Sequence, residues 1–408
     1  MKILFIHQNF PGQFKHLAAH YGARPEHEVW FITKRKTATI KGVRKIIYET
    51  KRKSGRMTHR YVKDLENGVI HGEAVAEKCV RMQKKGMVPD IVVAHPAWGE
   101  SLFIKDVFPE APLLNYFEFY FHGNSGDIGF DPAYPPTLED FKRIRIRNSL
   151  LQLSLEGCDW GITPTRWQWQ QHPERYRHKI SIIHEGVDTQ MIKPSRENFT
   201  LTMPDGRTLN RNDEVITYVA RNLEPYRGFP TFMRAMEIVL KRRPKAIAIV
   251  VGGDEVSYGQ HLPEGQTYRE IMLDQVDIDK KRVYFLGRIP YNRYLSILHI
   301  SSAHIYLTIP FVLSWSMLEA MSAGCLVIGS DTPPVQELLQ HEKNGLLVDF
   351  FSPEAIAEQI DRIMEHPDRM ARIRHAARRT IVERYDLKRV ALPRQIRLIE
   401  LIAAGVLM

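Results

Sequence analysis

The stretch LSWSMLEAMSAG, residues 313–324, places one carboxylate in an apolar, helix-like run. Ser314 and Ser316 are residue types that cap the start of a helix, so we expect a helix from Met317 with Glu319 in its first turns. If Glu319 is buried, it must find hydrogen-bond partners, because an unpaired buried carboxylate costs several kcal/mol. Two neighbouring ribose hydroxyls would satisfy both of its oxygens, and a nearby arginine is the alternative partner.

Two guanidinium groups follow another apolar run, in the sequence VARNLEPYRGF of residues 219–229. Arg221 comes directly after the strand-like residues 215–220, and Arg227 stands just before a glycine and a proline-initiated helix. A guanidinium keeps its charge and can donate two parallel hydrogen bonds to phosphate oxygens. The two arginines therefore predict a clamp for a diphosphate. A pair of ordinary surface arginines is the alternative interpretation.

Two glycine turns follow other strand-like runs. Gly12 and Gln13 come after residues 2–7 and before a helical stretch, and the N–H groups at a helix start attract phosphate. A tight turn without a ligand explains a single glycine more simply. Gly253 belongs to the glycine pair in VVGGD, residues 250–254, for which a flexible turn is also the simpler interpretation.

The elements that must hold these residues alternate between short apolar runs and helical periods. The expected strands are residues 2–7, 28–33, 90–95, 112–117, 160–165 and 180–188 and, after a polar linker at 189–213, residues 215–220, 246–254, 282–287, 303–308, 325–330 and 345–350. The expected helices include residues 137–156, 230–241, 291–300, 353–366, 368–384 and 386–404. This alternation is typical of parallel sheets with helices on both faces. It predicts an α/β protein of two doubly wound, Rossmann-like lobes facing each other across a cleft, with ligands at the carboxyl ends of the strands.

The composition excludes several other classes of protein. The 408 residues are 44% hydrophobic and 25% charged, which is typical of a globular chain with room for two to three domains. No apolar run reaches the roughly 20 residues of a membrane span, and the first residues lack the features of a signal peptide. Three scattered cysteines match no disulfide framework and no metal motif. We therefore expect a reduced, cytoplasmic setting.

The formal net charge of +10 is concentrated in one segment. Residues 34–63 contain twelve Lys or Arg residues and one acid, a balance of +11 that leaves −1 for the rest of the chain. Such a segment favours an anionic partner, namely phospholipid headgroups, a pyrophosphate-linked acceptor or nucleic acid. A solvated loop is the alternative. Nucleic acid is the least favoured partner, because no recognition helix or interleaved aromatic motif accompanies the charge.

Several motifs together resemble glycosyltransferase family 4, whose members have the two-lobed GT-B fold. They are IIHEGVDT (182–189), ARNLEPYRGF (220–229), VVGGD (250–254), VYFLGRIP (283–290), LSWSMLEAMSAGCLVIGSD (313–331) and VQELLQHEKNGLLVD (335–349). The sequence HQNFPGQFKHLA (7–18) is similar to one branch of that family. The resemblance implies an acceptor lobe of residues 1–190, joined by a final crossing helix of about 386–408, and a nucleotide-sugar lobe of residues 191–385.

The resemblance also implies roles for individual residues. Arg221 and Arg227 would bind the donor diphosphate, and Glu319 would bind the ribose hydroxyls. Backbone amides at residues 314–316 would face the phosphates and the sugar, and residues 287–289 would border the base. The further contacts expected with the nucleotide sugar come from Gly12, Gln13, Gly253, Gly287, Arg288, Ile289, Ser314, Trp315, Ser316 and Leu318.

Two positions depart from the family pattern. The family usually has two glutamates separated by seven residues, and the first of them falls on Phe311, so recognition of the sugar must differ. Many members place a histidine after the fourth strand of the first lobe, where this chain has Glu118. Glu118 is therefore the first candidate for contact with the reacting hydroxyl, His122 is the second and His95 is the third. For each of them a purely structural role is the alternative.

The resemblance implies transfer of a sugar from a nucleoside diphosphate sugar to a hydroxyl, with retention of anomeric configuration. No metal ion, and no cofactor besides the donor substrate, is expected. The acceptor would be a glycan, a lipid-linked molecule or another anionic molecule, and residues 34–63 would allow peripheral contact with an anionic membrane on its inner face. The alternatives are a sugar-nucleotide epimerase of the same fold and a basic nucleic-acid-binding protein, including one that transfers sugar to modified DNA.

Overall fold

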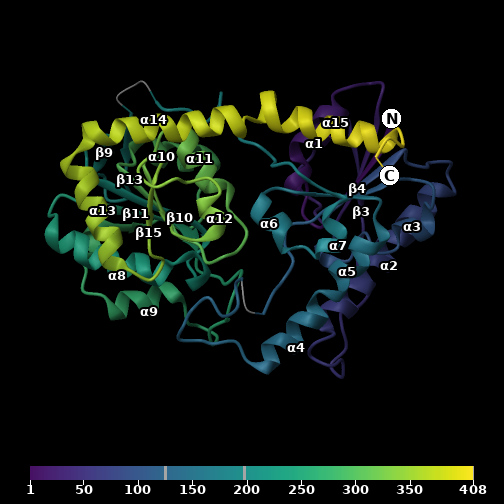
Figure 1. The fold of residues 1–408 in the computed structure, drawn as a ribbon, viewed down its shortest axis with the longest axis horizontal. Coiled ribbons are helices and arrows are strands. Elements are labelled where there is room, and N and C mark those ends of the chain that lie inside the picture. Colours follow the sequence, from purple (N-terminus) through teal and green to yellow (C-terminus); the bar gives the residue numbers. More distant parts are fainter. Residues whose placement is uncertain (124–125, 196–198, 408) are drawn as a thin grey trace. The chain divides into compact units, whose positions relative to one another are not determined.

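The computed structural model describes residues 1–123, 126–195 and 199–407 (Figure 1). The chain forms two compact units. Unit 1 consists of residues 1–186 together with the C-terminal residues from 388 onward, and unit 2 consists of residues 187–387. The last segment of the chain therefore belongs to the same unit as the N-terminus.

Unit 1 is built on a seven-stranded sheet in which neighbouring strands run parallel, in the order β3-β2-β1-β4-β5-β6-β7. The strands are β1 (Lys2–Ile6), β2 (Glu28–Thr33), β3 (Val43–Ile47), β4 (Ile91–Ala94), β5 (Leu113–Tyr116), β6 (Trp160–Thr163) and β7 (Ile180–Ile182). The inner strands β1 and β4 are almost wholly apolar, because both faces of a parallel sheet are covered.

Helices cover both faces of this sheet and leave its carboxyl edge to loops. They are α1 (Lys15–Gly22), α2 (Lys63–Gln83), α3 (Ile104–Val107), α4 (Leu138–Arg147), α5 (Ser149–Gly157), α6 (Arg166–Gln171), α7 (Glu174–Arg177) and α15 (Leu392–Ala403). On one face, Leu17 of α1 and Ile399 of α15 share a core cluster with Phe5 of β1. On the other face, Val75 of α2 and Leu155 of α5 share a second cluster with other strand residues.

Unit 2 repeats this architecture with a six-stranded parallel sheet in the order β12-β11-β10-β13-β14-β15. Its strands are β10 (Val215–Asn222), β11 (Ile247–Gly253), β12 (Val283–Phe285), β13 (Ala303–Tyr306), β14 (Val327–Ser330) and β15 (Leu346–Val348), and a separate antiparallel hairpin joins β8 (Thr200–Thr202) to β9 (Thr208–Asn210). Its helices are α8 (Phe229–Arg242), α9 (Tyr268–Gln275), α10 (Tyr291–Ile300), α11 (Trp315–Ala323), α12 (Pro333–Gln336), α13 (Pro353–Glu365) and α14 (Pro367–Arg384).

Three elements of the chain differ from the expected ones in kind or by several residues. The helix predicted over 137–156 is two helices, which meet at Asn148; the buried side chain of Asn148 accepts from the N–H of Phe121 (3.1 Å) and donates to the carbonyl of Phe121 (2.8 Å). The strand predicted over 180–188 ends at Ile182. The helix predicted over 386–404 starts with a π-helical turn at Leu387–Ala391 and then continues as α15.

Candidate functional site

The carboxyl edge of the sheet in unit 2 holds both predicted arginines. Arg221 is exposed near the end of β10 and has no ion-pair partner among the residues that the structure describes. Arg227 is half-buried in the turn before α8. Its Nη1 donates to Thr308 Oγ1 (2.8 Å) and to the carbonyl of Val312 (3.0 Å), and lies 3.5 Å from the hydroxyl oxygen of Tyr306. Because Nη1 makes all of these contacts, the N–H groups of Nε and Nη2 can donate hydrogen bonds to an anion.

Two tyrosines, Tyr291 and Tyr294, lie close to Glu319. The hydroxyl of Tyr291 donates to Glu319 Oε1 at 2.7 Å. Burial, and then the charge of Glu319, raise the pKa of Tyr291 and raise that of the buried Tyr294 well above its ordinary value. The sequence predicted ribose hydroxyls or an arginine as partners of Glu319 and did not foresee this tyrosine, which orients the carboxylate.

The helix that carries Glu319 begins earlier than predicted. α11 starts at Trp315, not Met317, and Ser314 is its N-cap, with Oγ accepting from the N–H of Ser316 at 3.3 Å. The prediction that Ser316 also caps is therefore wrong, because it lies inside the first turn. The free N–H groups and the helix dipole make this end partly positive. The side chain of Leu318 is fully buried in the core, so only its backbone can contact a ligand.

Two glycines at the ends of neighbouring strands keep this edge open. A Cβ at Gly253 would lie 2.6 Å from Asn222 Oδ1 and 2.9 Å from Arg288 Nε, so a larger residue would displace both side chains. Gly287 has a φ of 62°, in the left-handed region that favours glycine. Arg288 donates to Asn222 Oδ1 at 3.1 Å. Ile289 packs partly buried against the apolar core, so it too offers a ligand mainly its backbone.

Phe311, which stands where the family usually has a glutamate, lies in an aromatic cluster. Its ring centroid is 4.9 Å from that of Tyr258 and 5.8 Å from that of Tyr226. Sequence reasoning missed the buried acid beside this cluster, Glu224, although it stands in the ARNLEPYRGF motif. Glu224 Oε2 accepts from the N–H groups of Ser257 (2.6 Å) and Tyr258 (3.1 Å), and burial raises the pKa of Glu224. Aromatic rings thus replace the expected carboxylate.

Unit 1 brings Gln13, Glu118 and His95 together with His7, which sequence reasoning did not single out. His7 Nδ1 accepts from the N–H of Asn9 (2.9 Å), so Nε2 carries the proton and donates to Gln13 Oε1 (2.7 Å). This bond fixes the amide of Gln13, whose Nε2 donates to Glu118 Oε1 (3.3 Å). Glu118 Oε2 lies 3.8 Å from His95 Nε2, and the side chain of Glu118 is 34% exposed. Glu118 is therefore the accessible acid of this set.

Burial keeps both histidines neutral. Desolvation lowers the pKa of His7 to about 4, although its bond with Gln13 opposes the shift. Desolvation, and then the neighbouring His7, hold the pKa of His95 well below its ordinary value. Near neutral pH, neither imidazole therefore carries a positive charge toward Glu118, and the carboxylate can accept a hydrogen bond from a hydroxyl.

The other two predicted residues of unit 1 have different surroundings. Gly12 has a φ of 53°, and a Cβ there would lie 2.5 Å from His7 Nε2, so the bond between His7 and Gln13 requires glycine at this position. His122, the second candidate, is engaged elsewhere, because its Nε2 lies 2.7 Å from the carbonyl oxygen of Gln171. The hydrogen bonds thus link Gln13 to Glu118 but do not include His122.

A second buried acid in unit 1 was not foreseen. Glu100 Oε1 accepts from the hydroxyl of Tyr48 (2.6 Å) and from Gln8 Nε2 (3.2 Å), and burial raises the pKa of Glu100. Tyr48 follows β3 and Gln8 follows β1, so these residues meet only because the sheet brings the two strand ends to one edge. Sequence spacing alone carried no signal of this network.

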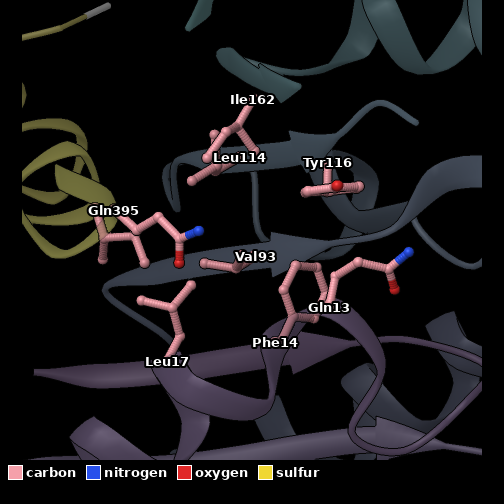
Figure 2. A pocket seen from close by; sticks show the side chains of 9 residues that line it. Gln13, Phe14, Leu17, Val93, Leu114, Tyr116, Ile162 and Gln395 are labelled. Atoms are coloured by element: carbon pink, nitrogen blue, oxygen red, sulfur yellow. The ribbon is translucent and has the colours of Figure 1, made fainter. Parts of the chain in front are cut away.

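The cavity behind Gln13 is too small for a sugar (Figure 2). Its volume is about 10 Å³, room for roughly one water molecule. Val93 and Leu114 line it from the sheet, and Gln13 and Gln395 stand at opposite ends. This cavity therefore cannot hold an acceptor sugar.

Within residues 1–123, 126–195 and 199–407, no group of three or more His, Cys, Asp or Glu side chains could hold a metal ion. In the same residues, no helix combines the length and the apolar character that crossing a membrane requires. Cys79, Cys158 and Cys325 are all buried free thiols.

Comparison with known proteins identifies relatives for both units. Residues 25–192 match the glycosyl transferase family 4 group, and residues 202–380 match glycosyl transferases group 1. An uncharacterized glycosyltransferase of Methanocaldococcus jannaschii is 23% identical over 263 residues, which are 63% of this chain and 60% of that protein. D-inositol 3-phosphate glycosyltransferase of Corynebacterium glutamicum is 25% identical over 198 residues, 48% of this chain and 46% of that enzyme. The matched part is thus less than two thirds of either relative's own length.

Among solved structures, HepE of Anabaena in complex with UDP and glucose is similar with a TM-score of 0.69 and 17% identity, covering 98% of this chain and 99% of that one. Two parallel α/β units with this likeness define a protein of the GT-B fold. The chain belongs to the family 4 type of glycosyltransferases, as the matches to its N-terminal and C-terminal parts show.

Proposed function

We propose that this protein transfers a sugar from a nucleoside diphosphate sugar to an acceptor hydroxyl, with retention of anomeric configuration. The observation that carries the proposal is the cationic carboxyl edge of unit 2. There Arg227 is anchored through one nitrogen, Arg221 is exposed, and Ser314 caps the start of α11. These groups would bind the diphosphate, and Glu319, held by Tyr291, would accept from the ribose hydroxyls.

Bond cleavage would leave negative charge on the departing diphosphate. The guanidinium groups and the N-terminus of α11 would stabilise that charge as it develops, and a fixed donor of this kind is worth about a hundred- to a thousand-fold in rate. In this proposal, the guanidinium groups and the N-terminus of α11 do what a metal ion does in other enzymes. The reaction then requires no cofactor besides the donor substrate. The residues at 287–289, with Gly253, would border the nucleoside.

Unit 1 would bind the acceptor. Glu118 Oε2 would accept a hydrogen bond from the reacting hydroxyl, while Gln13 holds Glu118 Oε1 in place. The departing phosphate would take the hydroxyl proton as the new bond forms on the same face of the sugar, which gives retention. The acceptor class that we propose is a glycan or an anionic molecule. A related enzyme is named for inositol 3-phosphate, which is an anionic acceptor.

The test begins with thermal-shift measurements against UDP-, GDP-, ADP- and dTDP-sugars, because binding of the right donor raises the unfolding temperature. The donor that stabilises the protein is then incubated with candidate acceptors in the presence of EDTA, and the anomeric configuration of the product is read by NMR. An altered free sugar formed without any acceptor would indicate an epimerase instead. Inversion of the anomeric centre, or loss of activity with EDTA, would overturn the corresponding part of the proposal.

A further inference from the structure

The three most exposed large apolar side chains of the described residues all lie in unit 1. Met57 is 97% exposed, Tyr134 is 76% exposed and Leu138 is 69% exposed, and Phe141 adds a further ring that is 40% exposed. Single exposed apolar residues are common, but a group of them on one surface marks an interaction site.

Two polar contacts place the loop that carries Met57 beside the start of α4, which carries Leu138 and Phe141. Arg60, three residues after Met57, pairs with Glu139 at 2.6 Å, and the hydroxyl of Tyr61 also bonds to Glu139. Glu139 is in the first turn of α4, next to Leu138. Figure 1 likewise shows the loop before α2 beside α4.

The loop of residues 51–63 is hydrogen-bonded to α2 on both sides of Met57. The N–H of Ser54 donates to Asn67 Oδ1 (2.9 Å), and Arg52 pairs with Glu66 (2.7 Å). Thr58, next to Met57, also donates to Glu66. These bonds tie both sides of the loop to the first turns of α2 and leave Met57 pointing into solvent.

Cations surround the apolar side chains. On α4, the exposed residues Leu138, Phe141, Lys142 and Arg145 are spaced as one helical stripe, while Ile144 on another side is buried. The loop contributes the exposed side chains of Lys53, Arg56 and Lys63, which make no ion pair with any residue of the described ranges. Residues 51–63 contain no acid at all.

We propose that this docking face, which consists of residues 51–63 with the Leu138 stripe of α4, binds the surface of an anionic lipid bilayer. Lysine and arginine would contact headgroup phosphates, and the methionine, leucine and aromatic side chains would enter the boundary between headgroups and acyl chains. Nucleic acid would use the same cations but would leave Met57 and Leu138 without an apolar partner. The inference concerns only unit 1 and does not depend on sugar transfer.

The expected effects follow from typical interfacial energies. Each cation near an anionic surface strengthens binding on the order of fivefold, so Lys53→Gln, Arg56→Gln and Lys63→Gln together should weaken vesicle binding about a hundredfold. Met57→Ser with Leu138→Ser should weaken it by roughly tenfold or more, since both side chains would lose apolar burial.

Binding of the full-length protein is measured by co-sedimentation with vesicles of phosphatidylcholine alone or with phosphatidylglycerol added. We expect binding to the anionic vesicles only, with losses in both variants. The matched controls are Lys280→Gln with Lys281→Gln, exposed cations of unit 2, and Met191→Ser, a methionine that is 54% exposed; both should bind like the wild type. Donor-induced thermal stabilisation should be unchanged in every variant, which separates this test from that of the transfer reaction.

Binding to duplex DNA, measured by fluorescence anisotropy at the same salt concentration, distinguishes the other anionic partner. The inference is supported if the apolar variant loses vesicle binding while any weak DNA binding stays the same. It is overturned if wild-type protein does not bind anionic vesicles at low salt, or if the apolar variant binds them as well as the wild type does.

Discussion

Arg227→Lys tests the geometry of the proposed donor site without removing the charge of residue 227. Nη1 of Arg227 bonds to Thr308 Oγ1 at 2.8 Å and to the carbonyl of Val312 at 3.0 Å. The guanidinium can hold these groups and still present its other N–H groups to a phosphate, because its five donors form a rigid fork. Lysine has a single ammonium group, which can bond either to Thr308 and Val312 or to the diphosphate, but not to both.

We therefore expect Arg227→Lys to lose most of the transition-state stabilisation. Loss of one well-placed donor lowers kcat about a hundred- to a thousand-fold, equivalent to roughly 2.7–4 kcal/mol. The structural loss should be smaller, about 1–2 kcal/mol in the free energy of unfolding, because the lysine ammonium can keep part of the three contacts of Nη1. The rate and the stability should thus change by clearly different amounts.

The assay measures kcat and KM with the identified donor, and urea unfolding on the same preparations. Arg234→Lys on α8 is the matched control, since that arginine is exposed and its polar contact is a 3.4 Å hydrogen bond to Gln275. The reasoning is refuted if Arg227→Lys folds normally and keeps kcat within about threefold of the wild type. A rise in KM alone would mean that Arg227 binds the donor without favouring the transition state.

Three further changes have defined outcomes. Gln13→Leu removes the hydrogen bond that positions Glu118 and should lower kcat roughly tenfold or more with little change in donor binding; equal kinetics would show that Glu118 needs no support. Asn148→Leu leaves the backbone N–H and C=O of Phe121 without their partner and should cost about 2–4 kcal/mol in urea unfolding, whereas Asn148→Asp should retain part of the stability. Burial lowers the pKa of His304 from 6.5 to about 4, so the unfolded chain binds a proton at this histidine before the folded chain does as the pH falls. The neutral imidazole therefore favours the folded state fully above pH 6.5. This contribution, about 3 kcal/mol, is lost between pH 6.5 and 4. His304→Phe should flatten the pH dependence of unfolding in that window, and an unchanged slope would contradict the assignment.

The strands could be predicted from sequence because parallel sheets bury both faces. Runs such as KILFI in β1 and IAIVVGG in β11 are apolar without interruption, and that pattern does not depend on distant residues. Element ends were less predictable. α11 begins two residues before the expected start, since Ser314 rather than Ser316 supplies the cap. Which of two serines caps a helix depends on backbone angles that composition does not determine.

Hydrogen bonds between residues far apart in the sequence could not be predicted. Tyr291 is 28 residues from Glu319, and the sequence offers no reason to choose it over an arginine. The same holds for Tyr48 and Glu100, which are 52 residues apart. Each pair meets because helices or strand ends converge at a sheet edge, and that convergence is known only when the topology is known.

The site in each unit shows the same division between groups that could contact a ligand and groups that hold them. Nη1 of Arg227 is anchored by Thr308, and Glu118 is held by Gln13. Sequence reasoning identifies the first kind, because charge and glycine spacing are visible in the chain, and misses most of the second kind, which are neutral and distant. Preorganisation of charged groups is what lowers a transition-state barrier. We therefore expect substitutions of the neutral holders to reduce kcat more than they reduce donor affinity.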